Sequence, residues 1–436
     1  MIRAFEEIFQ RMFSLIILIL EITILATYKA MGVICVDDLV AIVMVVVFSI
    51  SFIVTVQQGK VTKLYMNQLI AGYMIRVFLL FFDLFGKSIH TLPQSGADSS
   101  MFYRTSTELV LFGKTNRNGN FITFMYKVFS FIGINRLYGQ FLLMLLSIGA
   151  IIVFILCIDR LMISEGAKTH SAWIICLLPN FALLSSLFLR ESVVTFLITV
   201  SVYHMIIWLD EGNDIYCISA ILLSAISCFF HSGSVGITIG CVACLLLYDN
   251  NEKRIHPTIT SFVLTAIITI GLSFLFLRYG ESLMDKFVGV ESVSDIANTN
   301  SLGGSTYARY VGNSNNPINM VVYSIPRIAY FLFSPFPWQW RGVSDIIAFF
   351  FSGLYYLITI KNVILYFQRG NTKNQEKIIC LLVIAFFCTF IFAWGVSNTG
   401  TASRHRDKMV CLYGVLYALT KCTSETNVYR KTDYCN

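Results

Sequence analysis

The chain has 436 residues, of which 56% are apolar and only 13% are charged, and its formal net charge is +7. Soluble domains carry roughly 25% charged residues. Here the apolar residues come in long blocks, so the composition excludes a soluble enzyme, a disordered chain and a secreted disulfide scaffold. A polytopic α-helical membrane protein remains, because backbone groups in lipid must form hydrogen bonds within their own segment.

About twelve apolar runs predict membrane-spanning helices, since a helix needs roughly 20 residues to cross the hydrocarbon layer. In chain order the runs lie near Phe13–Thr27, Leu39–Val56, Gln68–Phe85, Tyr138–Ile158, Ser171–Leu189, Ser192–Leu209, Ile215–Phe230, Gly233–Tyr248, Ile259–Leu277, Val343–Phe367, Ile378–Val396 and Met409–Thr420. Several runs are short, so the count ranges over roughly 11–14 helices. The predicted fold is an all-α, polytopic integral membrane protein with one membrane domain over residues 1–436.

Loop charge predicts the orientation, because short cytoplasmic loops are enriched in lysine and arginine. A cytoplasmic N-terminus places the following cations in inner loops or in the C-terminal tail: Lys60, Lys63, Arg160, Lys168, Lys253, Arg254, Arg369, Lys373, Lys377, Lys421, Arg430 and Lys431. Both termini are then cytoplasmic. Two long segments, 87–137 and 278–342, and the short loop 397–408 lie on the outer side.

The apolar stretch Ile318–Phe336 does not fit this pattern as a span. It contains Pro326 and Arg327, and a crossing here would invert the charge pattern of the loops that follow. We therefore expect an interfacial or re-entrant hairpin on the outer side, with Trp338 and Trp340 at the level of the lipid headgroups.

The three outer segments together hold the chain's whole formal excess of +7, and their cations are mostly arginines. Arginine presents a planar fork that binds phosphate through two parallel hydrogen bonds and stays charged when partly desolvated. The outer face is therefore predicted to attract an anion such as a diphosphate. For any single arginine the alternative is headgroup anchoring or a loop ion pair.

The densest motif is the stretch Ser397–Arg406. Asn398 and Gly400 predict a tight turn, and Thr401 or Ser403 is a candidate cap of the following helix. Arg404 and Arg406 would then lie at the start of that helix, where the helix dipole also favours an anion.

The string Asn-x-Gly-Thr-Ala-x-Arg-His-Arg at 398–406 resembles the last outer loop of the O-antigen and oligosaccharide repeat-unit polymerases, the Wzy-type family. Three further stretches fit the resemblance, which runs from about Leu64 to about Val410: residues 96–103, the elbow 189–192 and residues 332–338. The resemblance implies a multi-helix membrane glycosyltransferase architecture that works without a metal or another cofactor.

The resemblance also implies a reaction. Such enzymes join oligosaccharide repeat units linked to undecaprenyl diphosphate into O-antigen or capsule, at the outer side of the bacterial inner membrane. The expected partners are the lipid-linked donor and acceptor, membrane lipid and a chain-length regulator, and no nucleic acid. Guanidinium groups suit this chemistry, because negative charge builds on the diphosphate as the glycosidic bond breaks.

The acceptor is a sugar hydroxyl, which needs a general base. The catalytic candidates are Asp98, Glu191, His231 and His405. The candidates for substrate binding are Arg190, Arg309, Arg404, Arg406, Arg341 and Tyr103. Several of these residues have a purely structural alternative. It is turn capping for Asp98, an elbow ion pair for Arg190 and Glu191, a membrane-boundary position for His231, and a spacer role for His405.

Two other functions remain open. An O-antigen ligase would use the same donor and a similar outer arginine and histidine site. A lipid-linked oligosaccharide flippase or another transporter would place its charges in a central cavity between related halves, and the sequence has no half-to-half similarity. The CxxC of Cys241 and Cys244 lies inside an apolar run without a second pair, so no metal site is predicted.

Overall fold

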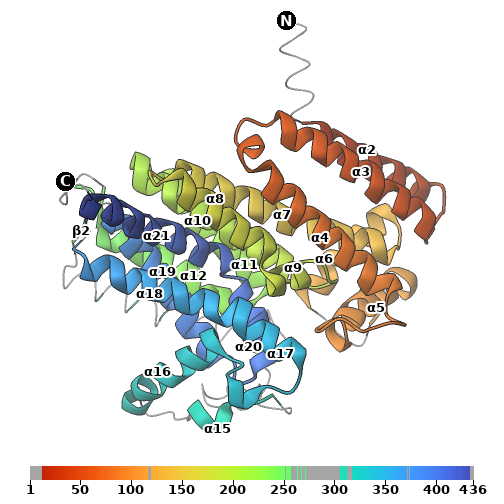
Figure 1. Cartoon of the computed structure of the whole chain (residues 1–436). Helices are drawn as coiled ribbons and strands as arrows, with labels where there is room; N and C mark the ends of the chain where they lie inside the picture. The colour runs from red at the N-terminus through yellow and green to blue at the C-terminus, as the bar shows by residue number, and fades with distance from the viewer. Residues whose placement is uncertain are drawn as a thin grey trace, which may run out of the picture. The chain divides into compact units, whose positions relative to one another are not determined.

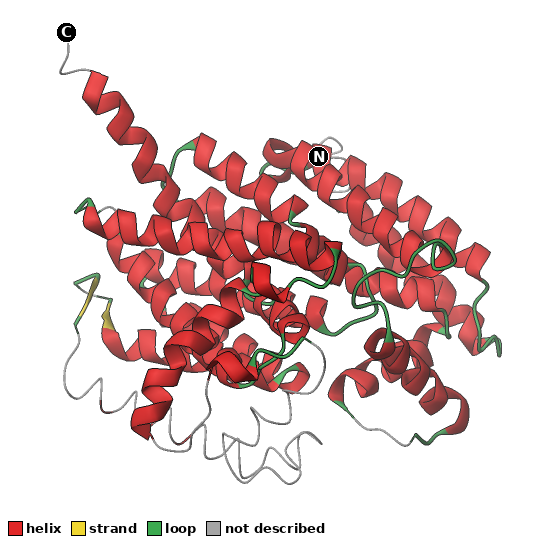
Figure 2. Cartoon of the chain, turned by 60° about the horizontal axis from the view of Figure 1, so that its bottom comes forward, coloured by secondary structure: helices red, strands yellow, loops and turns green. Residues whose placement is uncertain are grey.

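The computed structural model describes residues 12–115, 119–250, 252–256, 305–311, 317–370, 372 and 374–432, together with positions 263, 267 and 271. Figure 2 shows that the described chain is built from helices, with one short β-hairpin. The elements are α2 Phe13–Ala30, α3 Asp38–Gln58, η1 Thr62–Tyr65, α4 Met66–Phe85, α5 Ala97–Phe112, α6 Asn120–Ile132, α7 Arg136–Arg160, α8 Glu165–Leu177, α9 Pro179–Ser185, α10 Glu191–Glu211, α11 Asp214–Phe230, η2 Ser232–Ser234, α12 Val235–Leu247, β1 Tyr248–Asp249, β2 Arg254–Ile255, α15 Ala308–Val311, α16 Pro317–Phe333, η4 Pro337–Gln339, α17 Val343–Ile347, η5 Ala348–Gly353, α18 Leu354–Gln368, α19 Gln375–Trp394, α20 Thr399–Asp407 and α21 Val410–Thr432 (Figure 1).

The chain divides into two compact units, where the sequence predicts one membrane domain. Unit 1 consists of residues 1–155 and 182–192, and unit 2 consists of residues 156–181 and 193–436. Each unit is described by itself below.

The protein is an all-α polytopic membrane protein by the length and apolar character of its helices. Within the described residues, seven helical segments are long and apolar enough to cross a membrane: Phe13–Ala30, Asp38–Gln58, Thr62–Phe85, Arg136–Arg160, Glu191–Glu211, Val343–Gln368 and Gln375–Trp394. Each coincides with a predicted span.

The remaining predicted spans are shorter or interrupted. Ser171–Leu189 divides into α8 and α9, because Pro179 has no N–H to continue the helix and begins a new one instead. The helices α11 and α12 and the apolar part of α21 fall below span length. The predicted span Ile259–Leu277 lies outside the described residues, except for three helical positions.

The stretch Ile318–Phe336 forms one helix, α16, rather than a hairpin of two arms. Its apolar part, Val321–Phe333, is too short to cross a membrane. Pro326 lies inside the helix, and the chain turns after Phe333 through η4 into α17. The expectation that this stretch is not a span is therefore consistent with its length, whereas the hairpin within it is replaced by a continuous helix.

Ion pairs gather several predicted inner loops at one end of unit 2. Arg160 contacts Asp210 at 3.0 Å and also Glu211, and Lys377 forms an ion pair with Asp210. Lys253 donates to the main-chain carbonyl of Asp210 at 3.3 Å. These loops therefore share one end of the unit, and the side of the membrane that this end faces stays a prediction.

The opposite end of unit 2 is set by the packing of α12 against α19. Cβ atoms added at Gly236 and Gly240 would lie 2.6 Å from main-chain atoms of α19, so only glycine permits this approach. Such a small-xxx-small spacing is typical of closely packed membrane helices. The contact places His231, just before α12, beside Phe392 near the end of α19.

Reporter fusions test which end faces outward. We expect alkaline phosphatase fused after Ser305 or Arg404 to be active, because the enzyme folds only outside the cytoplasm, and a fusion after Lys253 to be inactive. Enzyme activity normalised to fusion abundance is the measurement. An inactive fusion after Arg404 together with an active one after Lys253 would show that the predicted orientation is wrong.

Candidate functional site

Two histidines that are distant in sequence meet in unit 2. Nε2 of His231 lies 3.1 Å from Nε2 of His405, and the two rings form an edge-to-face pair with centroids 4.3 Å apart. Phe392 packs against both rings, at 5.3 and 5.4 Å. Gly233 lies against Phe392 so closely that a Cβ atom would overlap the ring. The turn after α11 and the helix α20 thus hold the two imidazoles in one fixed arrangement.

The hydrogen bonds define which nitrogens carry protons in the neutral pair. The main-chain N–H of Gly233 donates to Nδ1 of His231 at 3.2 Å, so this nitrogen is unprotonated. Neutral His231 then carries its proton on Nε2 and donates it to Nε2 of His405. His405 must therefore carry its own proton on Nδ1. The remaining donor of His405 in the neutral pair is therefore Nδ1–H, which is buried in this structure, and His231 holds His405 in this tautomer.

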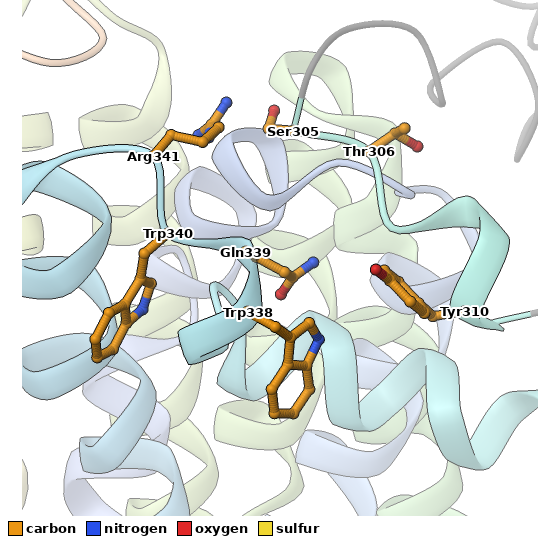
Figure 3. A pocket seen from close by; sticks show the side chains of 7 residues that line it. All are labelled: Ser305, Thr306, Tyr310, Trp338, Gln339, Trp340 and Arg341. Carbon is orange, nitrogen blue, oxygen red and sulfur yellow. The ribbon is translucent and has the colours of Figure 1, made fainter.

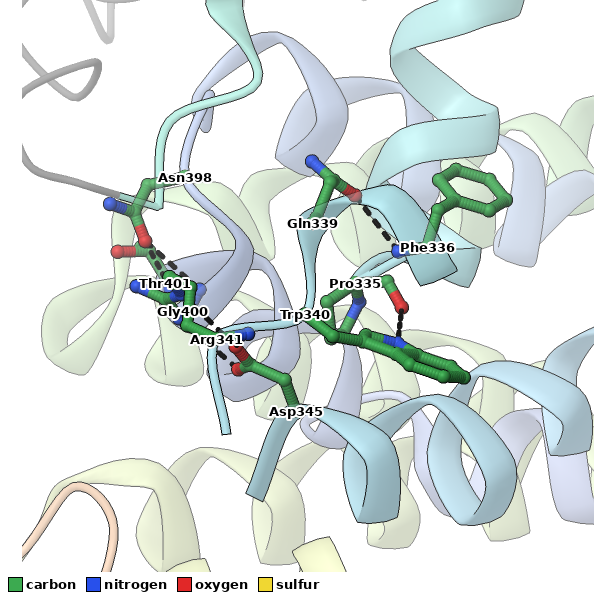
Figure 4. Close-up of polar contacts among 9 residues, drawn as sticks. All are labelled: Pro335, Phe336, Gln339, Trp340, Arg341, Asp345, Asn398, Gly400 and Thr401. Carbon is green, nitrogen blue, oxygen red and sulfur yellow. Dashed lines mark hydrogen bonds and ion pairs between the residues drawn. The ribbon is translucent and has the colours of Figure 1, made fainter. Parts of the chain in front are cut away.

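The helix α20 begins earlier than the sequence suggests. Asn398 caps it, with Oδ1 accepting from the N–H groups of Gly400 at 2.9 Å and Thr401 at 3.4 Å (Figure 4). The predicted cap at Thr401 or Ser403 is therefore wrong. Asparagine is among the best N-caps, and the helix begins at the residue that follows it, Thr399. Arg404, His405 and Arg406 occupy the last turn rather than the first. There the negative end of the helix dipole favours cations, so the dipole does not add to an anion site.

Arg406 is fully buried, and its guanidinium donates hydrogen bonds to main-chain carbonyls. Its exposed fraction is 0%. Nε donates to Ser352 Oγ at 2.9 Å, and Nη1 donates to the carbonyl oxygen of Leu332 at 3.0 Å and to that of Ser334 at 2.5 Å. Burial lowers the pKa of the guanidinium, against the effect of Asp407. Arg406 thus binds the C-terminal end of α16 in this structure, which differs from its predicted contact with a substrate.

Polar residues next to Arg406 fix the end of α20. The carboxylate of Asp407 accepts from Nδ2 of Asn180 at 2.6 Å. Burial raises the pKa of Asp407 to about 7, although Arg406, the Asn180 hydrogen bond and Lys408 each oppose the rise. Lys408 is buried with its ammonium 5.7 Å from the ring centre of Phe392. Lys408 and the two histidines therefore contact the same phenylalanine, and the attraction of an anion to this loop stays a prediction.

A hollow of about 170 Å³ opens beside α20, lined by Ser305, Thr306, Tyr310, Trp338, Gln339, Trp340 and Arg341 (Figure 3). One wall is joined to the segment before α20 by strand pairing. Tyr307 N donates to the carbonyl of Ser397 at 2.8 Å, and Thr399 N donates to that of Ser305 at 3.0 Å. The other wall follows α16, whose last carbonyls Arg406 holds. Both walls are thus attached to the helix that carries His405.

One predicted arginine, Arg341, lines this hollow. Arg341 forms two hydrogen bonds with the carboxylate of Asp345, at 3.0 and 3.1 Å (Figure 4). Half of its side chain is exposed, so a surface ion pair and a ligand contact are both compatible with its position. Arg309 lies in α15, and its side chain is outside the described part of the chain.

Two further residues near α20 are not among the site residues that the sequence predicts, although an arginine inside an apolar stretch is a signal that could have identified Arg327. Arg327 of α16 is buried, with its guanidinium 4.4 Å from the ring centre of Trp394, and Nη1 donates to Ser397 Oγ at 3.4 Å. Tyr307 is buried, and its hydroxyl donates to the carbonyl of Val396 at 3.1 Å. Burial raises the pKa of Tyr307, opposed by Arg327 and Arg406. Tyr307, two residues before Arg309, therefore anchors this segment to the end of α19.

Unit 1 contains a separate polar cluster around Asp83, a buried carboxylate near the end of α4. Ser95 Oγ donates to Asp83, and so does Gln140 Nε2 at 3.1 Å. Arg136 lies 3.8 Å from the same carboxylate, with its guanidinium 5.5 Å from the ring centre of Tyr103. A carboxylate within an apolar run is the signal that could have identified this cluster, because membrane-embedded charges need partners.

The predicted residues of α5 lie in different surroundings. The ring of Tyr103 packs edge-on against Phe129 and Phe188, and burial raises the pKa of its hydroxyl despite nearby Arg136. Asp98 is exposed in the first turn of α5, where a carboxylate suits the helix dipole. Tyr103 is thus part of the polar cluster of unit 1. The position of Asp98 at the start of a helix fits the structural alternative, in which it stabilises the helix end.

The elbow before α10 is packed rather than open. Arg190 lies with its guanidinium 5.9 Å from the ring centre of Phe102. Glu191 is buried and is the first residue of α10. Among the predicted residues, the contact between His231 and His405 is the one that the structure shows directly within its described part.

Comparisons with protein-family models, with curated proteins and with solved structures find no match for the chain.

Proposed function

We propose that the protein is a polysaccharide repeat-unit polymerase of the bacterial inner membrane. It joins oligosaccharide units carried on undecaprenyl diphosphate into O-antigen or capsule, with its site on the periplasmic side and without a metal or another cofactor. The observation that carries the proposal is the hydrogen bond between His231 and His405, next to Arg404 in a setting rich in positive charge.

The proposed role of this site is to stabilise the leaving group. A sugar hydroxyl of the acceptor attacks the anomeric carbon of the growing glycan, and the bond between that carbon and the diphosphate oxygen breaks. The electron pair stays on the lipid diphosphate. Donors placed in advance at the developing charge lower the barrier. The guanidinium of Arg404 and Nδ1–H of His405 are the donors that we propose, and His231 holds the imidazole in the required tautomer. Nδ1 of His405 is buried in this structure, so the diphosphate has to displace what covers it.

The proton released by the acceptor hydroxyl goes to a general base. The closed histidine pair is poorly suited to this task, because both ring nitrogens of His231 and the lone pair of His405 are already used. The choice of Glu191 or Asp98 as this base stays a prediction from the sequence alone, because both residues belong to unit 1 and the histidine pair belongs to unit 2.

A cellular experiment tests the proposal through Arg404. The Arg404→Ala variant is expected to lower chain lengthening by about 10²- to 10³-fold, because one donor to the developing charge is lost. Surface glycan on a gel should then collapse from a ladder to single repeat units. The control is Arg104→Ala, which removes an exposed ion pair with Glu108 and should leave the ladder unchanged.

The same gel separates the rival functions. An unchanged ladder in Arg404→Ala, at normal protein abundance, contradicts the proposed role. Loss of all surface glycan, single units included, favours a ligase or a flippase, because a polymerase is needed only for additional units.

A further inference from the structure

The hollow beside α20 has the composition of a saccharide subsite. A sugar ring combines an apolar face of C–H groups with a rim of hydroxyl groups, so it pairs with an exposed aromatic ring bordered by planar polar groups. Trp338 provides the ring, with 63% of its surface exposed. Gln339, Tyr310 and Thr306 provide amide and hydroxyl groups at the same hollow.

The aromatic side chains that line the hollow are held in place by neighbouring rings. In Figure 3 the amide of Gln339 and the hydroxyl of Tyr310 face each other across the hollow, and the indole of Trp338 lies below them. The Trp338 ring is stacked on Phe336 at 4.7 Å, and the Tyr310 ring on Tyr330 at 5.5 Å. Such backing reduces the conformational entropy lost on binding.

The size and position of the hollow favour a single sugar ring. Its volume of about 170 Å³ is well below that of a pocket for a drug-sized molecule, roughly 300–1,000 Å³. Its wall at Ser305 and Thr306 pairs with Asn398 and Thr399, the residues that begin the helix of His405. A ring held here would be attached to a glycan whose reacting end lies near that helix.

We propose that this hollow binds one sugar ring of the glycan, with the apolar face of the ring on Trp338. This deepens the proposed function, on which the identity of the glycan as a lipid-linked repeat unit rests. The binding itself requires no turnover, so it is measured separately from chain lengthening.

Saturation-transfer NMR on the full-length protein in nanodiscs tests the subsite. The probes are the methyl glycosides of glucose, galactose, mannose, rhamnose and N-acetylglucosamine. At least one should receive saturation from the wild-type protein, and its affinity should fall about tenfold in Trp338→Ala. Trp338→Phe should retain part of the binding. The control Trp173→Ala removes a partly exposed indole from α8 and should bind like the wild type.

Two outcomes would overturn the subsite. One is the absence of transfer to all five glycosides in the wild-type protein. The other is equal binding by Trp338→Ala and wild type, which would leave Trp338 as an anchor at the lipid interface. In either case continued chain lengthening by the wild type would still support the polymerase. Conversely, glycoside binding lost in Trp338→Ala, in a protein that lengthens no chains, would support the subsite and refute the polymerase.

Discussion

Replacing His405 by alanine is expected to slow the lengthening of lipid-linked glycan by about 10²- to 10³-fold, the effect of removing one donor from a developing oxyanion. The imidazole is held between Phe392 and His231, and its tautomer is defined by the bond from Gly233 to His231. Nothing in an alanine side chain replaces the Nδ1–H that, in our proposal, donates to the diphosphate once the substrate has displaced what covers it. The rate of chain lengthening by purified variants in proteoliposomes is the measurement.

His231→Ala should have a smaller effect than His405→Ala, because His231 positions its partner rather than contacting the diphosphate. The double variant should be no slower than His405→Ala alone, since residues that act as a unit are not additive. A double variant that is slower by the product of the two single effects would contradict the positioning role. His256→Ala is the matched control, because this histidine pairs with Glu252 in the loop near β2.

Arg406→Ala is expected to destabilise the protein by about 3–5 kcal/mol, the usual effect of breaking a buried charged network. The substitution leaves the carbonyls of Leu332 and Ser334 and the hydroxyl of Ser352 without their donor in a fully buried place. The unfolding temperature in detergent, followed by intrinsic fluorescence, should fall clearly. Arg406→Lys should be intermediate, because one ammonium cannot reproduce the planar fork.

Arg341→Ala is the control for this prediction. It removes a bidentate pair with Asp345 that is half-exposed, and exposed pairs contribute no more than about 1 kcal/mol. Equal unfolding temperatures for Arg406→Ala and Arg341→Ala would mean that the buried guanidinium does not hold α16 to α20.

The fold was predictable where apolar runs were long and uninterrupted. Hydropathy identifies α3 and α7 almost to the residue, because lipid requires continuous helices. It fails at Pro179, where one apolar run becomes two short helices, and at α16, where Pro326 is accommodated inside a helix. Apolar content alone does not distinguish these cases, since both depend on which backbone groups find partners in the folded chain.

The site was predictable in its residue types more than in its geometry. The cations of the loop 397–408 are evident in the sequence, but its helix was expected to start three or more residues later. The pairing of His231 with His405 joins residues far apart in the chain, which no local pattern reports. Burial separates Arg406 from Arg404, although the sequence presents them as equivalent.

The most direct test of the central claim is a reconstitution with purified protein and one lipid-linked repeat unit as the only substrate. The proposed function predicts a ladder of longer lipid-linked glycans on a gel, produced by the wild type and lost in Arg404→Ala and His405→Ala. Repeat units that cross the bilayer with their length unchanged would contradict it and identify a transporter.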